Sequence, residues 1–290
     1  MKTMKILSGV LLLSLMLAEI TLGDIQKRVI GAGTCSPTER QYHVRLTAKN
    51  PSKGLQKDCS SSLITNKWLL TAARCWPDGP EWKMYAEAVG DPGPVKPLVE
   101  IKQKAIHKDK NGRTHDIMLL QLPRPVPGAV PGPGVDPISL GDCAQFLAKL
   151  RGKTSKPEEF QTVQIAGYAA TTPAAPDAGE PDAGEPDAGE PDAGEPAAEA
   201  PAAANTKVLH CAELDVMKCD ASMAKSHQDI FCAQRVGVET CRGDSGAGVV
   251  YKNQLYGVFI ADNTGEECSA AALIMDVCKY KVWIKKIIGK

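Results

Sequence analysis

Three short stretches of the sequence carry residues that could act together in catalysis. GDSGAG at 243–248 sets Ser245 among glycines, which let the backbone turn sharply and leave a hydroxyl exposed. The amides of Gly243 and Ser245 can then point at one oxyanion and stabilise its charge. A serine with oxyanion donors beside it is part of a nucleophilic hydrolase. Asp116 in HDIMLLQL and Arg74 in LLTAARC are charged residues within otherwise apolar stretches.

Arg74 does not fit the packing of its segment. The apolar run 68–70 indicates a buried strand, and the small residues 71–73 indicate a crowded turn into Cys75. A general base must accept a proton near working pH. Arginine stays charged at all working pH values and has no acceptor nitrogen, so Arg74 cannot serve as a general base.

The rest of the chain supplies the elements that must position these residues. Short apolar runs separated by turn residues recur along it and indicate strands, typical of a β-sandwich or β-barrels. These runs are HVRL 43–46, SLIT 62–65, WLLT 68–71, DIMLLQL 116–122, TVQIAGY 162–168, GAGVV 246–250 and LYGVFIA 255–261. At the C-terminus, Val282, Trp283, Ile287 and Ile288 recur near a helical period, which predicts one terminal helix.

The first residues predict export. Lys2 and Lys5 precede an apolar run at 6–18, so we expect a signal peptide at 1–23 and a short propeptide at 24–28. The run is short for a membrane span, and no other long apolar run occurs. We therefore expect a secreted, extracellular protein with no membrane span.

An acidic insert at 172–206 interrupts the chain. It contains four copies of PDAGE at 176–195, nine acidic residues and neither Lys nor Arg. The overall net charge is zero, but without this insert and the first 28 residues the chain carries +7. Pro and Gly in every repeat and little apolar surface predict a disordered loop, either a solvated spacer or an acidic tether for a cationic surface.

The ten cysteines fit an oxidising compartment and predict five disulfides. Because no CxxC pair occurs, we expect no zinc site, and no other cofactor is implied. The cysteine spacing by itself leaves the pairing open.

Six segments taken in order resemble the trypsin/chymotrypsin-like serine proteases. They are RVIGAGTC 28–35, LLTAARC 69–75, HDIMLLQL 115–122, QIAGY 164–168, CRGDSGAG 241–248 and VWIKKII 282–288. The resemblance covers residues 29–290 apart from the insert. It implies an all-β fold of two antiparallel β-barrels with a C-terminal α-helix and the active site between the barrels.

The resemblance also implies roles for individual residues. Ser245 matches the nucleophile, Asp116 matches the aspartate that orients the base, and Arg74 stands where the catalytic histidine is expected. The implied disulfides are Cys35–Cys211, Cys59–Cys75, Cys143–Cys278, Cys219–Cys232 and Cys241–Cys268. We hypothesise that Arg74 forms a charge-assisted pair with Asp116, preserving the fold while ending the chemistry.

His115 adjoins Asp116 and is a candidate replacement base. Neighbouring side chains in a strand point to opposite faces, so we expect His115 to point away from the site and to be a surface loop residue.

The substrate pocket and the activation segment are assigned by the same resemblance. Glu239 matches the pocket base, and the pocket wall falls at Ile260, Ala261, Asp262 and Ala272. These residues predict a narrowed, partly filled slot, although Glu239 could favour a basic group. Cleavage after Arg28 would release the amine of Val29, which the resemblance sets against Asp244.

Together these features favour a catalytically inactive serine protease homologue that acts by binding an extracellular protein. It would serve as a decoy or modulator of proteolysis, or as a defence, venom or mucus component. We expect a monomer and no nucleic-acid partner. The alternative is a secreted endopeptidase with weak or unusual activity through Ser245 and Asp116. A third interpretation is a structural or ligand-binding protein that reuses the fold.

Overall fold

The computed structural model describes residues 32–36, 38–87, 98–125, 136–143, 162–168, 209–219, 229–260, 268–269 and 271–289. The expected signal peptide, propeptide and acidic insert lie outside these residues. No helix in the described part of the chain is long and apolar enough to cross a membrane.

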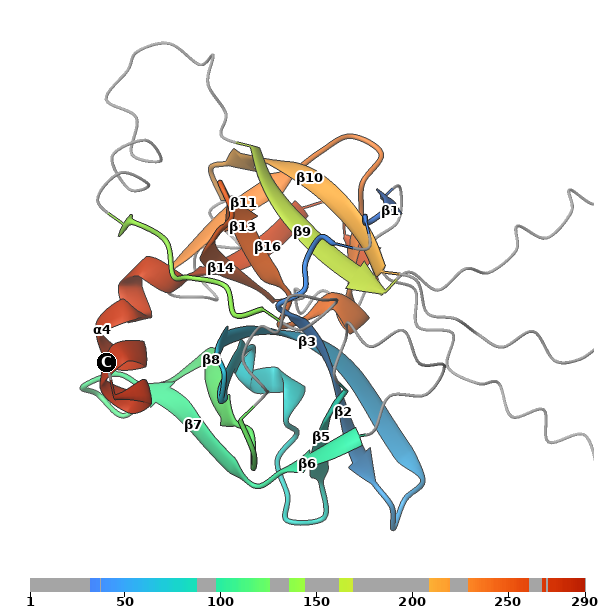
Figure 1. Ribbon diagram of the computed structural model, residues 1–290, viewed down its shortest axis with the longest axis vertical. Coiled ribbons are helices and arrows are strands. Elements are labelled where there is room, and N and C mark those ends of the chain that lie inside the picture. The colour runs from blue at the N-terminus through green and yellow to red at the C-terminus, as the bar shows by residue number, and fades with distance from the viewer. Residues whose placement is uncertain are drawn as a thin grey trace, which may run out of the picture.

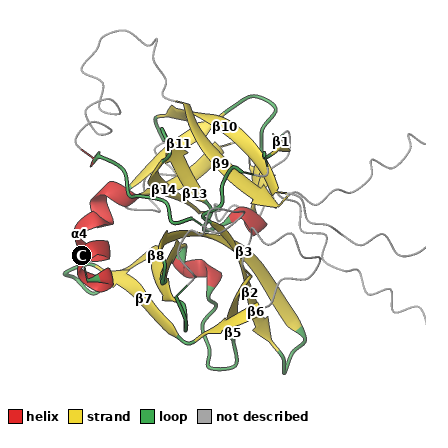
Figure 2. Cartoon of the chain, viewed as in Figure 1, coloured by secondary structure: helices red, strands yellow, loops and turns green. Residues whose placement is uncertain are grey.

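Two curled antiparallel sheets make up the molecule, as the resemblance implied (Figures 1 and 2). The first sheet has the order β6-β5-β2-β3-β4-β8-β7. Its strands are β2 (His43–Asn50), β3 (Leu55–Thr65), β4 (Trp68–Thr71), β5 (Lys83–Glu87), β6 (Leu98–Ile101), β7 (Gln103–Lys108) and β8 (Thr114–Gln121). A 3₁₀ helix, η1 (Ala73–Cys75), follows β4.

The second sheet has the order β1-β10-β11-β16-β14-β13-β9, and β9 also pairs with β10, so six of its strands form a closed ring. Its strands are β1 (Gly33–Thr34), β9 (Thr162–Tyr168), β10 (Leu209–Met217), β11 (Ile230–Gln234), β13 (Gly248–Tyr251), β14 (Gln254–Ile260) and β16 (Ala271–Asp276). A short pair, β12 (Thr240–Cys241) and β15 (Cys268–Ser269), accompanies the 3₁₀ helix η2 (Arg242–Asp244).

Each of the seven predicted apolar runs coincides with a strand, with shifts at the ends: Leu122 lies just beyond β8, and Ala261 lies outside the described residues. GAGVV enters its strand at Gly248 and not at residue 246, because Gly246 adopts a turn conformation with φ +90°. The interior of the first sheet continues into Leu255 and Val258 of the second sheet and into Tyr280 of the helix. One apolar core therefore spans both sheets and the helix, and a second buried cluster, which includes Val163, Leu214 and Phe259, lies within the second sheet.

The predicted terminal helix is α4 (Val277–Ile288). The Asp276 carboxylate accepts a hydrogen bond from the Cys278 amide and begins the helix, and Gly289 ends it in the left-handed conformation. Val277, Tyr280 and Ile284 form its buried face. Val282, one of the four residues whose spacing predicted the helix, is 84% exposed and does not belong to this face.

Four disulfides fix the described elements, and they are four of the five that the resemblance implied: Cys35–Cys211, Cys59–Cys75, Cys143–Cys278 and Cys219–Cys232. The side chains of Cys241 and Cys268 lie outside the described residues. Their backbones are direct partners across β12 and β15. That fifth pair stays a prediction, on a backbone that places the two residues opposite each other.

A buried ion pair lies within the first sheet. Arg45 Nη2 donates to Asp58 Oδ2 over 2.6 Å, and both side chains are 9% exposed. Thr47 Oγ1 donates to the other carboxylate oxygen over 3.0 Å. Without Asp58, Arg45 would stay buried with only its longer contact to Glu87, over 3.5 Å, and its charge would be largely uncompensated.

Asp58→Ala should therefore lower the free energy of unfolding by about 3 kcal/mol or more, because it leaves Arg45 buried without its main partner. Glu213→Ala is the matched control, since Glu213 pairs with Arg235 at the surface, where its side chain is 51% exposed. We expect the control to cost less than about 1 kcal/mol. Urea unfolding with the disulfides intact measures both, and equal losses would contradict the prediction.

Candidate functional site

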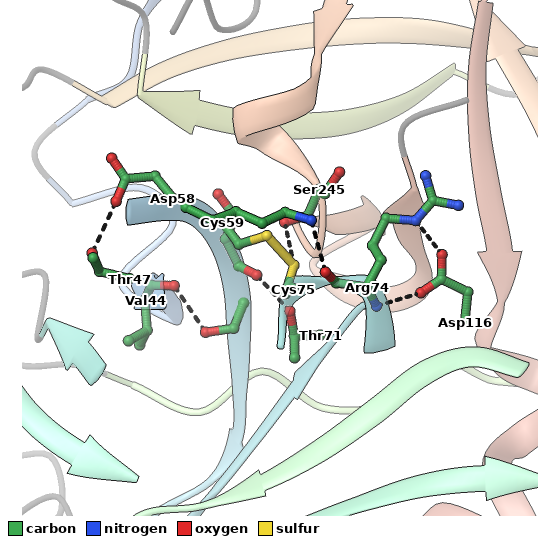
Figure 3. The surroundings of a disulfide bond; sticks show 12 residues. Val44, Thr47, Asp58, Cys59, Thr71, Arg74, Cys75, Asp116 and Ser245 are labelled. Carbon is green, nitrogen blue, oxygen red and sulfur yellow. Dashed lines mark hydrogen bonds and ion pairs between the residues drawn. A yellow bond between two sulfur atoms is a disulfide. The ribbon is translucent and has the colours of Figure 1, made fainter. Parts of the chain in front are cut away.

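The candidate site lies where the two sheets meet, and three elements build it. Arg74 is in η1, Asp116 is in β8 and Ser245 follows η2. The Ser60 amide donates to the Ser245 carbonyl over 2.8 Å, and Cys75 Sγ lies 3.3 Å from the same oxygen. The structure thus brings Ser245 of the second sheet against the segment that carries Arg74 (Figure 3).

Arg74 and Asp116 form the ion pair expected from the sequence. The Arg74 backbone amide donates to Asp116 Oδ1 over 2.8 Å, and Arg74 Nε donates to Oδ2. Both oxygens of the carboxylate therefore receive a donor from one residue (Figure 3). The side chains are 21% and 16% exposed, respectively, so solvent only partly screens the pair.

Small and cross-linked residues fold the segment around Arg74. Ala72 is fully buried, and Thr71 Oγ1 donates to the Ser60 carbonyl over 2.7 Å. Cys75 is fully buried and bonded to Cys59 of β3. Lys57 Nζ donates to the Arg74 carbonyl over 2.8 Å. These contacts fix the Arg74 backbone, so its amide is held toward Asp116.

The glycines of GDSGAG are needed because the two sheets approach closely here. A Cβ on Gly246 would lie 2.0 Å from the Ser60 carbonyl oxygen and 2.2 Å from Thr71 Oγ1. A Cβ on Gly248 would lie 2.2 Å from Ser62 Oγ. The glycines at 246 and 248 therefore pack directly against the CSSS stretch at 59–62. Ser245 is only 1% exposed.

Comparison with known proteins agrees with this geometry. The sequence model of the family named trypsin matches residues 29–175 and 193–284. The chain belongs to the trypsin family. Human kallikrein-8 is 27% identical, over 91% of this chain and 88% of its own. Serine protease sp-Eoc49 of Echis ocellatus is 27% identical, over all of this chain and 96% of its own.

A solved structure shares the trypsin-family fold. It is that of the scabies mite inactivated protease paralogue S-I1, with a TM-score of 0.58 and 20% sequence identity. The alignment covers 89% of this chain and 99% of the mite protein. At this identity the likeness shows the fold.

Within this trypsin-family fold, Arg74 can donate hydrogen bonds and hold charge, and it cannot accept a proton. Its guanidinium has five N–H donors and no acceptor. In Figure 3 its terminal nitrogens lie on the side of Nε away from the Asp116 carboxylate. The arrangement can therefore neutralise Asp116, and Arg74 itself cannot act as a general base.

His115 faces away from Asp116's partner, as expected. Its Nδ1 lies 2.7 Å from the Tyr280 hydroxyl of α4, whereas Asp116 binds Arg74. The interpretation of His115 as a surface loop residue was wrong. It lies in β8 and is 8% exposed, because α4 covers this face of the strand.

The residues assigned to the substrate pocket differ in burial. Ile260 and Ala272 are fully buried in the paired strands β14 and β16, whereas Glu239 is exposed beside β12. Ala261 and Asp262 lie outside the described residues. The assignment of these positions to a specificity pocket stays a prediction.

Activation also stays a prediction. Asp244 is fully buried in η2, while Arg28 and Val29 lie outside the described residues. The acidic insert is likewise not described, but Tyr168 and Leu209 on either side of it are direct partners across β9 and β10.

Gly246→Ala should destabilise the protein by about 3 kcal/mol or more. The change places an alanine at a positive φ, which strains the backbone, and its Cβ would clash with the Ser60 carbonyl oxygen. Gly237→Ala is the matched control, because Gly237 also has a positive φ, +78°, but has open space around its Cβ. We expect the control to cost about 1 kcal/mol. Urea unfolding distinguishes the two, and similar losses would refute close packing at Gly246.

Proposed function

We propose that this protein is a secreted, proteolytically inactive homologue of trypsin-family proteases that acts by binding an extracellular protein. The observation that carries the proposal is the Arg74–Asp116 ion pair. In this proposal Asp116 matches the aspartate that orients a histidine base, and Arg74 stands in the place of that histidine. The carboxylate that would orient the base holds a permanent cation instead.

Elementary chemistry supports inactivity. Serine is a weak nucleophile unless a neighbouring base takes its proton, and arginine stays charged at all working pH values. Loss of one triad member leaves about 10³–10⁴-fold catalysis over water from the oxyanion site and substrate binding. Gly243 and Ser245 are the proposed oxyanion donors. The name of the mite structure, an inactivated protease paralogue, is in keeping with this conclusion.

Secretion is supported by chemistry and by the relatives. Four disulfides suit an oxidising compartment, and the N-terminal 23 residues have the composition of a signal peptide. We propose that the binding role is that of a decoy or modulator of proteolysis, or of a defence, venom or mucus component. A venom role has support in a 26% identical relative, snake venom serine proteinase 11 of Crotalus adamanteus.

A weak protease is the second candidate. This candidate is favoured because Ser245 and Asp116 are both retained and both contact η1. A protein that only binds a partner would not need the Ser245 hydroxyl or the Asp116 carboxylate for catalysis. It would need a base that is not Arg74. His115 does not serve, because its imidazole binds Tyr280 on the other face of β8.

Peptide amide hydrolysis tests the proposal, using protein processed after Arg28. We expect the wild-type rate to equal that of Ser245→Ala. Arg74→His should raise the rate about 10²-fold or more, because it supplies a proton acceptor beside Asp116. Arg74→Gln is the matched control, since it removes the cation without supplying a base.

Hydrolysis by the wild type that is lost in Ser245→Ala would contradict inactivity and favour the weak protease. An inactive Arg74→His variant would instead locate a further block in the predicted substrate pocket.

A further inference from the structure

Two histidines lie face to edge between the first sheet and the C-terminal helix. His107 of β7 and His115 of β8 have ring centroids 5.0 Å apart. His107 also contacts Tyr280 and Trp283 of α4, with centroids 5.1 and 5.2 Å away. Figure 1 shows α4 beside the β7–β8 end of the sheet. The histidine pair therefore packs directly against the middle of α4.

Only part of the hydrogen-bonding capacity of this pair is used. His115 Nδ1 lies 2.7 Å from the Tyr280 hydroxyl, and this contact joins β8 to α4. His107 Nδ1 and His115 Nε2 are buried and have no hydrogen-bond partner among the described residues. In a neutral imidazole, the unprotonated nitrogen carries no charge, so leaving it without a hydrogen bond costs comparatively little. Protonation would convert each nitrogen into a charged donor, which is costly to bury without an acceptor.

The nearest carboxylate is already engaged. Asp109 Oδ2 lies 3.7 Å from His115 Nε2, beyond hydrogen-bond length. The same oxygen accepts from Arg113 Nε and Nη2 at 3.2 and 3.1 Å, and Oδ1 accepts from the Asn111 and Arg113 amides. These bonds, that of the Arg113 amide first, lower the pKa of Asp109 and keep it ionised. The Asp109 carboxylate is thus largely engaged in hydrogen bonds within the β7–β8 turn.

The other charges around the cluster do not reverse this balance. Burial, and then the neighbouring His115, lower the pKa of His107, while Asp109 and Asp229 act in the opposite direction. Burial, followed by Asp229, Asp276 and Asp116, raises the pKa of Tyr280, so its hydroxyl stays protonated. The neutral form of His107 is therefore the form that suits the closed helix.

We infer that His107, His115 and Tyr280 form a pH-sensitive latch that holds α4 against β7 and β8 at neutral pH and releases it in acid. The inference rests on the fold alone and is independent of the proposed binding function. Release would affect residues 280–288, because the Cys143–Cys278 disulfide keeps the start of α4 attached.

The direction follows from proton linkage. A histidine in the released state has an ordinary pKa of about 6.5, and the pKa of His107 in the closed state is lower. The released state therefore binds more protons than the closed state as the pH falls below about 6.5. Closure is fully favoured above that pH and weakens as the pH falls toward the lower value.

Amide hydrogen exchange of the full chain tests the latch, with protection factors corrected for intrinsic exchange at about pH 7.5 and about pH 5.0. We expect protection of residues 280–288 to fall several-fold in acid, because the released state, in which His107 has its ordinary pKa, takes up more protons than the closed state. In His107→Phe, which keeps a ring against Trp283 but cannot titrate, the fall should shrink by most of that factor. His210→Phe is the control, because His210 lies in β10 near Ala32, and it should behave as the wild type.

Unchanged protection in wild-type protein, or the same fall in His107→Phe, would overturn the latch. Should His107→Phe fail to fold, NMR titration of the wild-type histidines decides instead. A His107 pKa below about 6.5 supports the latch, and a value at or above it refutes the latch.

Discussion

A mostly buried carboxylate at the junction of the two sheets must be neutralised, and the structure around the site depends on how that is done. Asp116 is 16% exposed, and both of its oxygens are satisfied by the backbone amide and the guanidinium of Arg74. Because η1 is fixed by Cys75 and Thr71, the cation is delivered from a rigid turn. Asp116 is therefore neutralised by Arg74, whose guanidinium has no nitrogen that can accept a proton.

The close packing of the two sheets does not depend on the Arg74–Asp116 ion pair. The Ser60 amide binds the Ser245 carbonyl, and Gly246 fits against the Ser60 carbonyl only because it lacks a side chain. These contacts use the backbone of the GDSGAG motif and make no demand on the Ser245 hydroxyl. A trypsin-family chain can thus retain this motif for close packing of the sheets, whatever the reactivity of the serine.

The sequence predicted the parts of the fold that depend on local pattern. Uninterrupted apolar runs identified β4, β8 and β9, and ordered motifs identified the family and the Arg74–Asp116 pair. Among the strands that were missed, β7 and β10 have charged residues between their apolar positions. Glu213 and Asp215 of β10, for example, are compensated by Arg235, which directly follows β11. The His115–Tyr280 contact joins residues 165 positions apart, and no local pattern could reveal it.

The reactivity of the Ser245 hydroxyl tests the central claim most directly, because it reports whether any group accepts the serine proton. The measurement is the rate and stoichiometry of labelling of processed protein by a serine-directed phosphonate, with Ser245→Ala as background. The ion pair and the 1% exposure of Ser245 predict labelling at the background rate. Stoichiometric labelling that maps to Ser245 and disappears in Ser245→Ala would show an activated nucleophile and contradict the account.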